Sequence, residues 1–243
     1  MQLTRQFLNY RPRSTTLYFD DPVNFDSEQN YNKNCTALGN TWEYHNKKIS
    51  YVFNEWGFRE KTFDNIDWKN SVVVFGCSNT FGTGLAEENT VTVQLEKKLN
   101  MPVINLGISG SAVDLAAVNS LILHENYPKP KAIVHLWTVG ERYSDFNNFK
   151  TKNVRRFNIH DSEYNNNINW EERSKFYILA DRVLWKNQLP YYEASWFDRS
   201  AKTYNIDLLE TLDKARDLIH PGSISTQVAA EKIASGLKAK GLI

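Results

Sequence analysis

The sequence predicts an α/β fold, a three-layer sandwich in which a mainly parallel β-sheet lies between two layers of helices. Short apolar runs rich in β-branched residues alternate along the chain with longer segments that carry helical apolar spacing. Glycines follow the first such run, at 71–76, where a buried parallel strand would turn into a helix. At 243 residues the chain is long enough for one α/β domain with a sizeable core.

The first 70 residues are expected to form an arm and a β-hairpin. Residues 1–40 are rich in Asn, Asp, Tyr and Thr without a sustained period, which predicts an irregular arm that packs by its aromatic side chains. The segments 41–44 and 49–53, separated by polar residues, predict the hairpin. We expect this part to pack on a core formed by residues 71–243, so that the whole chain makes a single domain.

Within the core, parallel strands are expected to alternate with crossover helices. The predicted strands are 71–76, 102–106, 132–138 and 189–195. The predicted helices are 90–99, 112–125, an amphipathic segment at 170–187 and a C-terminal helix at 225–237. The carboxyl ends of the strands would then share one edge of the sheet, where ligands bind in open α/β folds.

An Asn-rich, aromatic stretch at 143–170 interrupts this alternation, and its position suggests a lid or a pocket wall. Its aromatic side chains Phe157, Tyr164 and Trp170 could stack on a sugar ring or line an acyl pocket. The alternative is that each of them only packs in the core or on the surface.

Ser78 lies in the turn that follows the first predicted strand. A serine presented there can act as a nucleophile. We expect the helix at 90–99 to begin beside it, where unpaired N–H groups and a partial positive charge would suit an oxyanion. The neighbouring Cys77 is a competing nucleophile, but adjacent residues leaving a strand point to opposite sides, and we expect Ser78 to react.

Asp217 and His220 form a D-x-x-H pattern near the C-terminus, followed by Pro221 and Gly222. A serine hydroxyl needs a base to accept its proton, and the base needs a third group that fixes its tautomer. His220 and Asp217 are candidates for these two roles. The alternative is a helix that ends at His220, with the imidazole facing the helix dipole and Asp217 solvated.

Together these segments resemble the SGNH or GDSL superfamily of serine hydrolases. The resemblance spans roughly residues 50 to 238, and four segments carry it in the family's order and spacing. They are N-E-W-G-F-R at 54–59, G-C-S-N-T at 76–80, N-L-G-I-S-G at 105–110 and D-L-I-H-P at 217–221. The resemblance implies a flavodoxin-like hydrolase fold over 71–243, a triad of Ser78, His220 and Asp217, and an oxyanion hole formed by the N–H groups of Ser78 and Gly110.

The chain departs from the family pattern in two places. Cys77 stands where the family usually has an aspartate that transfers no proton. The third block of the family supplies an asparagine amide to the oxyanion hole, whereas residues 132–142 contain no asparagine. Gly140 or a neighbour occupies that position, and Thr138 or Arg142 could replace the donor. The alternative is that Thr138 only ends a strand and Arg142 pairs with a surface acid.

The resemblance implies an ester hydrolase that forms an acyl-enzyme on small acyl esters, with O-acetylated carbohydrate as the best single substrate. An O-acyltransferase, a lipase or a thioesterase would use the same triad. A catalytically silent binding or structural protein on this scaffold is the third class, and the missing asparagine favours it.

Composition narrows the possible partners. A net charge of +1 with scattered basic residues argues against nucleic-acid binding. No apolar run approaches the ~20 residues that span a bilayer, and the N-terminus lacks the apolar core of a signal peptide, which predicts a cytoplasmic protein without membrane insertion. The two cysteines, Cys35 and Cys77, make neither a disulfide framework nor a metal site. We expect no metal or cofactor, and the sequence makes no prediction of the oligomeric state.

Overall fold

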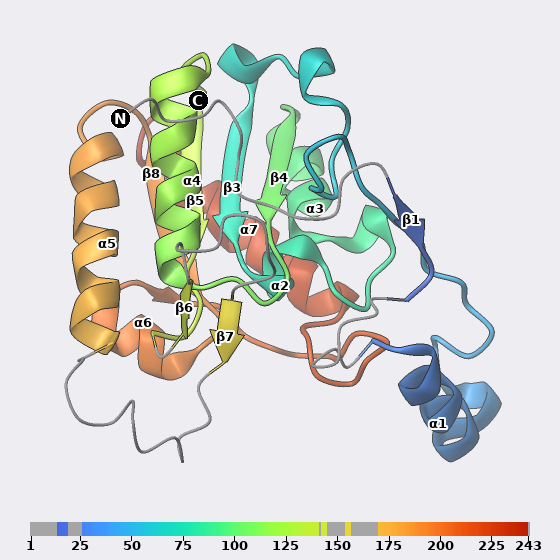
Figure 1. The fold of residues 1–243 in the computed structure, drawn as a ribbon. Coiled ribbons are helices and arrows are strands. Elements are labelled where there is room, and N and C mark those ends of the chain that lie inside the picture. Colours follow the sequence, from blue (N-terminus) through green and yellow to red (C-terminus); the bar gives the residue numbers. More distant parts are fainter. Residues whose placement is uncertain (1–13, 19–25, 141, 145–153, 157–169, 243) are drawn as a thin grey trace.

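The computed structural model describes residues 14–18, 26–140, 142–144, 154–156 and 170–242. Its centre is a five-stranded sheet in the order β4-β3-β5-β8-β9, in which every neighbouring pair is parallel (Figure 1). The strands are β3 (Val72–Gly76), β4 (Val103–Gly107), β5 (Ala132–Leu136), β8 (Tyr191–Ser195) and β9 (Asp207–Leu208). The four predicted strands are confirmed within two residues at each end. The fifth, β9, was not predicted because a two-residue strand of exposed side chains carries no apolar pattern.

Helices cover both faces of this sheet, so the predicted three-layer arrangement is confirmed (Figure 1). On one face, α4 (Val113–Asn126) and α5 (Trp170–Trp185) pack against alternate side chains of β3, β4 and β5. On the other face, α3 (Val91–Leu99) and α7 (Ser223–Ala239) pack against the remaining side chains of β3 and β5. All five residues of β3 are buried, as expected for a strand between two helical layers.

The N-terminal prediction was wrong in two respects. Residues 41–44 form no strand; instead a 3₁₀ turn, η1 (Gly39–Thr41), precedes further turns, and β2 (Tyr51–Val52) pairs antiparallel with β1 (Thr15–Thr16). The arm also contains a helix, α1 (Glu28–Leu38), whose first turn is capped by the Ser27 side chain. None of its residues is buried, and without an apolar face the helix leaves no period in the sequence.

Shorter elements complete the described chain. They are α2 (Ser78–Phe81), α6 (Asp198–Tyr204), the 3₁₀ turns η2 (Phe63–Asn65), η3 (Trp68–Asn70) and η4 (Glu87–Asn89), and the antiparallel pair β6 (Arg142–Ser144) and β7 (Val154–Arg156). The predicted pocket residues Phe157 and Tyr164, and the side chain of Trp170, lie outside the described part of the chain.

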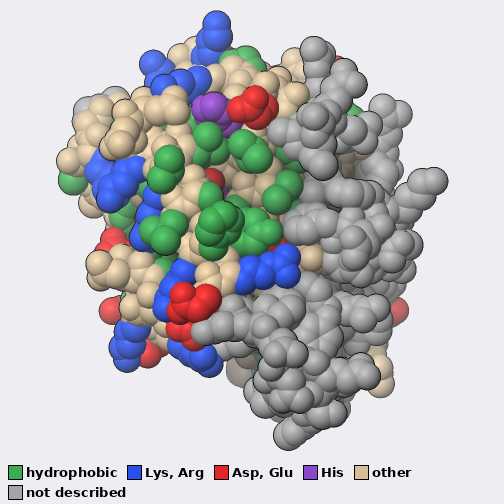
Figure 2. All heavy atoms as spheres, turned by 60° about the vertical axis from the view of Figure 1, so that its left-hand side comes forward, with side chains coloured by type: hydrophobic (Ala, Val, Ile, Leu, Met, Phe, Trp, Pro, Cys, Tyr) green, Lys and Arg blue, Asp and Glu red, His purple; other side chains and the backbone are tan. Residues whose placement is uncertain are grey.

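The outer surface of α5 is apolar. Phe176, Leu179 and Val183 are exposed and recur at helical spacing, and hydrophobic side chains gather on the side of the molecule where α5 lies (Figure 2). Within the described residues, no helix has both the length and the apolar character needed to cross a bilayer.

Candidate active site

The register of the central strands brings three predicted site residues to one edge of the sheet. Gly76, the last residue of β3, pairs with Gly107 of β4 on one side and with Leu136 of β5 on the other. The segments that carry Ser78, Gly110 and Thr138 leave these three strand ends within a few residues. In this sheet β4 lies on one side of β3 and β5 on the other. In open parallel sheets, ligands usually bind at the carboxyl ends of strands at such a point.

Ser78 is the first residue of the short helix α2. Its carbonyl accepts hydrogen bonds from the N–H groups of Gly82 at 3.0 Å and Thr83 at 3.1 Å, and Gly82 ends the helix in the left-handed region with φ of 82°. The helix that begins at Ser78 is therefore α2. The predicted helix at 90–99 is α3, which starts at Val91 only after the chain turns at Gly82 and passes through η4.

The Ser78 side chain has more access to solvent than its neighbour. Ser78 is 7% exposed and Cys77 is 1% exposed, and the Ser78 hydroxyl lies 4.0 Å from the Cys77 sulfur. The buried thiol is consistent with Ser78 rather than Cys77 as the group that meets a ligand.

Asn105 braces α2 against β4. Its side-chain amide donates to the Thr80 carbonyl at 3.2 Å, and its oxygen accepts from the Gly107 N–H at 3.0 Å. A β-carbon at Gly107 would lie 2.5 Å from the backbone nitrogen of Phe81, so only glycine allows α2 to lie this close to the strand. The asparagine of this segment thus supports the Ser78 turn.

Gly110 lies in a turn after β4 that closes through a hydrogen bond from the Ser111 N–H to the Ile108 carbonyl at 3.0 Å. Its φ of 76° falls in the left-handed region, and it is partly exposed. The Ser111 hydroxyl donates to the Gly76 carbonyl at 3.1 Å, which fixes the turn to the end of β3. Among the described residues, the Gly110 N–H has no hydrogen-bond partner.

Asp217 and His220 contact each other directly. Asp217 Oδ2 pairs with His220 Nδ1, while Oδ1 accepts hydrogen bonds from the N–H groups of Ile219 and His220, both at 3.0 Å. Both side chains are buried. Burial by itself raises the pKa of Asp217, but the hydrogen bonds and charge of His220 and the two N–H donors hold that pKa below its ordinary value. The carboxyl group is therefore ionised at neutral pH.

The structure places His220 in a turn and not at the end of a helix. Residues 211–222 form turns, with an isolated bridge between Lys214 and Pro221, and Leu218 lies in the left-handed region with φ of 62°. The alternative, a helix that ends at His220 with the imidazole facing its dipole and Asp217 solvated, was therefore wrong. The helix in this region is α7, which follows His220.

The loop after Ser78 and the turn before His220 lie against each other. The Arg216 N–H donates to the Gly84 carbonyl at 3.0 Å. Gly84 has a φ of 79°, and a β-carbon there would lie 2.8 Å from the β-carbon of Ala215 and 3.3 Å from the Asp217 nitrogen. The loop at Gly84 and the turn at 215–217, which are far apart in the sequence, are thus in direct contact.

Arg59 clamps the same loop from the other side. Its guanidinium donates to the carbonyl groups of Gly82 and Leu85, both at 2.9 Å, and lies 4.7 Å from the Tyr51 ring centre. The side chain is buried. The N-E-W-G-F-R segment at 54–59 therefore supports the Ser78 loop through Arg59, a role that the motif alone did not reveal.

The strand end after β5 contains two of the proposed replacement donors in contact. Arg142 Nη1 donates to the Thr138 hydroxyl at 3.1 Å, and Thr138 is buried. The Gly140 carbonyl accepts from the Ser174 hydroxyl at 3.0 Å. A β-carbon at Gly140 would lie 2.2 Å from the Tyr204 hydroxyl, so an asparagine does not fit there without a shift of that ring.

Asp114, at the start of α4, is a polar group near this edge that sequence reasoning missed. It accepts hydrogen bonds from the Ser144 N–H at 2.9 Å and the Ser144 hydroxyl at 2.7 Å, and Arg173 lies 3.4 Å from it. Burial raises the pKa of Asp114, although the hydrogen bonds from Ser144 and the charge of Arg173 act to lower it. Because its oxygens bind β6, we assign it the structural role of holding β6 on α4.

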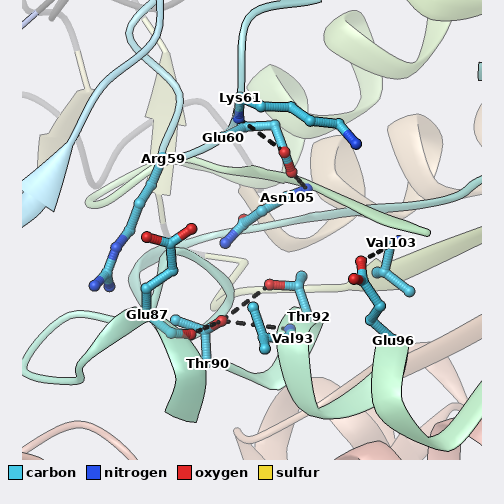
Figure 3. Close-up of a pocket in the computed structure, with 10 residues that line it drawn as sticks. All are labelled: Arg59, Glu60, Lys61, Glu87, Thr90, Thr92, Val93, Glu96, Val103 and Asn105. Carbon is cyan, nitrogen blue, oxygen red and sulfur yellow. Dashed lines mark hydrogen bonds between the residues drawn. The ribbon is translucent and has the colours of Figure 1, made fainter. Parts of the chain in front are cut away.

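A cavity of about 210 Å³ lies beside α3 and the edge strand β4 (Figure 3). Its lining includes Arg59, Glu60, Glu96 and Asn105, but not Ser78, Asp217 or His220. Glu60 accepts hydrogen bonds from the N–H groups of Asn105 at 2.7 Å and Lys61 at 2.9 Å, and burial raises its pKa to about 7. The hydrogen-bonded Asp217–His220 pair lies outside this cavity, and the cavity lining contains neither Ser78 nor a cysteine.

The described residues contain no group of three or more His, Cys, Asp or Glu side chains placed to hold a metal ion. Cys35 and Cys77 are both free thiols.

Neither a family profile nor a curated protein sequence matches the chain. Several solved structures are similar in part. A candidate lipolytic protein of the G-D-S-L family from Desulfitobacterium hafniense is 17% identical with a TM-score of 0.45, over 69% of this chain and 99% of the other. An acetyl xylan esterase from Butyrivibrio proteoclasticus is 12% identical with a TM-score of 0.49, over 72% and 64% of the two chains. A family two carbohydrate esterase from Clostridium thermocellum, solved with cellohexaose, is 15% identical with a TM-score of 0.45, over 72% and 66%. At these identities and TM-scores, the similarities assign neither an activity nor a substrate to this chain.

Proposed function

We propose that the protein is a serine ester hydrolase in which Ser78 is the nucleophile, His220 the base and Asp217 the group that orients His220. One observation carries the proposal. A buried, ionised aspartate binds Nδ1 of a histidine, on a turn whose Arg216 N–H is hydrogen bonded to the loop that follows the candidate nucleophile. Base, orienting acid and nucleophile on contacting segments are what nucleophilic catalysis by serine requires.

The contact with Asp217 assigns the two ring nitrogens of His220 different roles. Because Nδ1 carries the proton shared with the carboxylate, Nε2 has the free lone pair and accepts the proton of the Ser78 hydroxyl. The serine oxygen then bonds to the ester carbonyl carbon, and the resulting imidazolium is stabilised by Asp217. The proton on Nε2 passes to the leaving alcohol, and an acyl-enzyme remains.

Water completes the cycle by the same steps in reverse. His220 accepts a proton from water, the hydroxide attacks the acyl carbon, and the Ser78 oxygen leaves with the proton from Nε2. The oxyanion formed in each half of the cycle would be held by the N–H groups of Ser78, at the start of α2, and of Gly110, whose turn is fixed to the end of β3. Thr138, Gly140 and Arg142 stay candidates for a third donor.

We propose small acyl esters as the substrates, and O-acetylated carbohydrate as the first class to test. This choice follows from the resemblance of the sequence to the SGNH or GDSL hydrolases. If a second hydroxyl compound replaces water as the acyl acceptor, the same residues perform acyl transfer.

Turnover of p-nitrophenyl acetate tests the proposal. The wild-type protein should release p-nitrophenol and label with a fluorophosphonate, whereas Ser78→Ala should show only background release and no labelling. Cys77→Ala is the matched control, because it changes the adjacent buried side chain and should keep most of the activity. Loss of activity in Cys77→Ala with retention in Ser78→Ala would assign the nucleophile to the thiol instead.

A catalytically silent binding or structural protein is the second candidate. The observation that favours it is the end of β5, where no asparagine is present and the Thr138 hydroxyl already contacts Arg142. Binding of acetylated oligosaccharide by both the wild type and Ser78→Ala, without acetate release by either, would support this second candidate.

A further inference from the structure

A closed ring of hydrogen bonds joins four separate parts of the chain, at Asp26, Tyr51, Gly84 and Arg216. The Gly84 N–H donates to the Tyr51 hydroxyl at 2.7 Å, and that hydroxyl donates to Asp26 Oδ2. Asp26 also accepts two hydrogen bonds from the Arg216 guanidinium, from Nε to Oδ1 and from Nη2 to Oδ2, both at 2.8 Å. The backbone closes the ring, because the Arg216 N–H donates to the Gly84 carbonyl at 3.0 Å.

The side chains of this ring are fully enclosed. Asp26 and Arg216 are each 1% exposed, and Tyr51 is 0% exposed. Arg216 also donates to the Leu17 carbonyl at 2.8 Å and lies over the Tyr18 ring, 4.9 Å from its centre. A buried bidentate pair of this kind resists rearrangement, because removing one partner leaves the other charge buried and uncompensated.

The ring lies where the two halves of the proposed triad meet. Arg216 directly precedes Asp217, and Gly84 belongs to the loop that follows the helix of Ser78. Asp26 and Tyr51, by contrast, belong to the segment before the sheet begins and come into contact with neither Ser78 nor His220 through any described hydrogen bond.

We propose that Asp26 and Tyr51 are positioning residues, which set the placement of the His220 turn relative to Ser78 by holding Arg216 and Gly84 together. The inference rests on the proposed triad. The N-terminal segment is then part of the active-site machinery, since a displacement of about 1 Å between reacting groups can lower turnover by about 10²-fold.

Steady-state kinetics of Tyr51→Phe and Asp26→Asn test the proposal. Tyr51→Phe removes the hydroxyl that accepts from the Gly84 N–H and keeps the packing of the aromatic side chain. Asp26→Asn removes the negative charge opposite Arg216. Each variant should lower kcat for p-nitrophenyl acetate about 10- to 100-fold, with KM within about twofold of the wild type, because alignment changes and ester binding does not.

Tyr191→Phe is the matched control. Tyr191 is buried, and its hydroxyl donates to the buried Asp181 at 2.7 Å, at the opposite end of the sheet strands from Ser78. This variant loses the same kind of tyrosine–aspartate hydrogen bond and should melt at a lower temperature than the wild type, but its kcat should stay within about twofold.

Amide hydrogen exchange reports on the ring without depending on catalysis. Tyr51→Phe should accelerate exchange of the Gly84 and Arg216 amides, which donate within the ring, and Tyr191→Phe should leave both unchanged. The double variant Asp26→Asn/Tyr51→Phe should lose little more kcat than the worse single variant, because the two side chains act through one network.

The outcomes separate the two proposals. If Ser78→Ala abolishes turnover but Tyr51→Phe and Asp26→Asn keep wild-type kcat, the positioning role is wrong and the hydrolase stands. If the wild type shows no Ser78-dependent turnover, the proposed function fails and the catalytic role of the ring fails with it. Unchanged exchange at Gly84 and Arg216 in Tyr51→Phe would show that the ring does not couple the two turns at all.

Discussion

At the scale of single residues, neighbouring hydrogen-bond donors and acceptors determine the ionisation and orientation of the candidate site side chains. Asp217 shows this most directly, because one carboxylate oxygen binds the backbone of its own turn and the other binds the imidazole. The first oxygen fixes the shape of the turn and the second fixes the tautomer of His220. A substitution that keeps the shape can therefore remove the chemistry alone.

Asp217→Asn should lower kcat by about 10³–10⁴-fold while the protein stays folded. The asparagine oxygen can keep the bonds from the Ile219 and His220 N–H groups, but its NH₂ group then faces Nδ1. The proton of the imidazole moves to Nε2, which can no longer accept one from Ser78. Turnover of p-nitrophenyl acetate and a thermal melt measure the two effects.

The control for this variant is Asp213→Asn. Asp213 lies in the same stretch and accepts hydrogen bonds from the Ile224 and Ser225 N–H groups at the start of α7. Its replacement should lower the melting temperature and keep kcat. Equal kcat for Asp217→Asn and the wild type would remove Asp217 from the mechanism.

The residues of the candidate site differ in how far the sequence revealed them. Ser78, Asp217 and His220 stand in short local patterns, and the structure brings the segments that carry them into contact. Asp26 and Arg216 are 190 positions apart, and nothing near either residue indicates a partner. A buried ion pair between distant segments is set by the tertiary fold alone, so a single sequence does not predict it.

At the scale of elements, strands were easier to predict than the connections between them. The four central strands are short, mainly apolar and mainly buried segments, and all were predicted. The 41–53 segment has the alternation of a hairpin, yet only Tyr51–Val52 form a strand, and Tyr44, Ile49, Tyr51 and Phe53 form one buried cluster with Phe81 of α2. Packing against a site-bearing helix thus overrides the local strand pattern.

In the proposed oxyanion hole, a third donor would come from the segment after β5. We expect that Arg142→Ala lowers kcat by about 10²-fold, the loss typical of one oxyanion donor, and that Thr138→Val lowers it less by releasing the guanidinium that its hydroxyl holds. Steady-state turnover of p-nitrophenyl acetate measures both.

Arg199→Ala is the charge-matched control, since Arg199 lies on the neighbouring α6, is highly exposed and pairs with Glu171. Turnover equal to the wild type in both Arg142→Ala and Thr138→Val would mean a hole of two backbone donors. Gly140→Asn does not test this point, because the added side chain would collide with the Tyr204 hydroxyl.

At the scale of the whole molecule, two buried carboxyl groups, Asp217 and Glu60, make the stability of the fold depend on pH in opposite directions. The pKa of Asp217 is held below its ordinary value, so its favourable contribution is present above the unfolded pKa of about 4 and is lost as the pH falls. Glu60 behaves inversely, because burial raises its pKa to about 7 from 4.5. Between these two values the folded protein binds more protons than the unfolded chain, and stability falls as the pH rises.

The wild-type protein should lose stability between about pH 5 and about pH 8, and Glu60→Gln should lose less. The urea midpoint of unfolding, measured at each of these two pH values, gives the difference. Glu96→Gln is the control, because Glu96 lines the same cavity and also accepts from a β4 N–H, that of Val103 at 3.0 Å, but is exposed. A wild-type pH dependence in Glu60→Gln would show that this carboxyl group is not the cause.

The ring that joins Asp26, Tyr51, Gly84 and Arg216 also bears on how activity arises during synthesis. Its first and last members are 190 positions apart, so it closes only after Arg216 has left the ribosome. Such long-range closure comes late in folding, since the entropy of a large loop is lost before its contacts form. A nascent chain that has not yet been extended past Arg216 would carry Ser78 without its proposed base, and hydrolytic competence would appear only after the His220 turn has been made and docked.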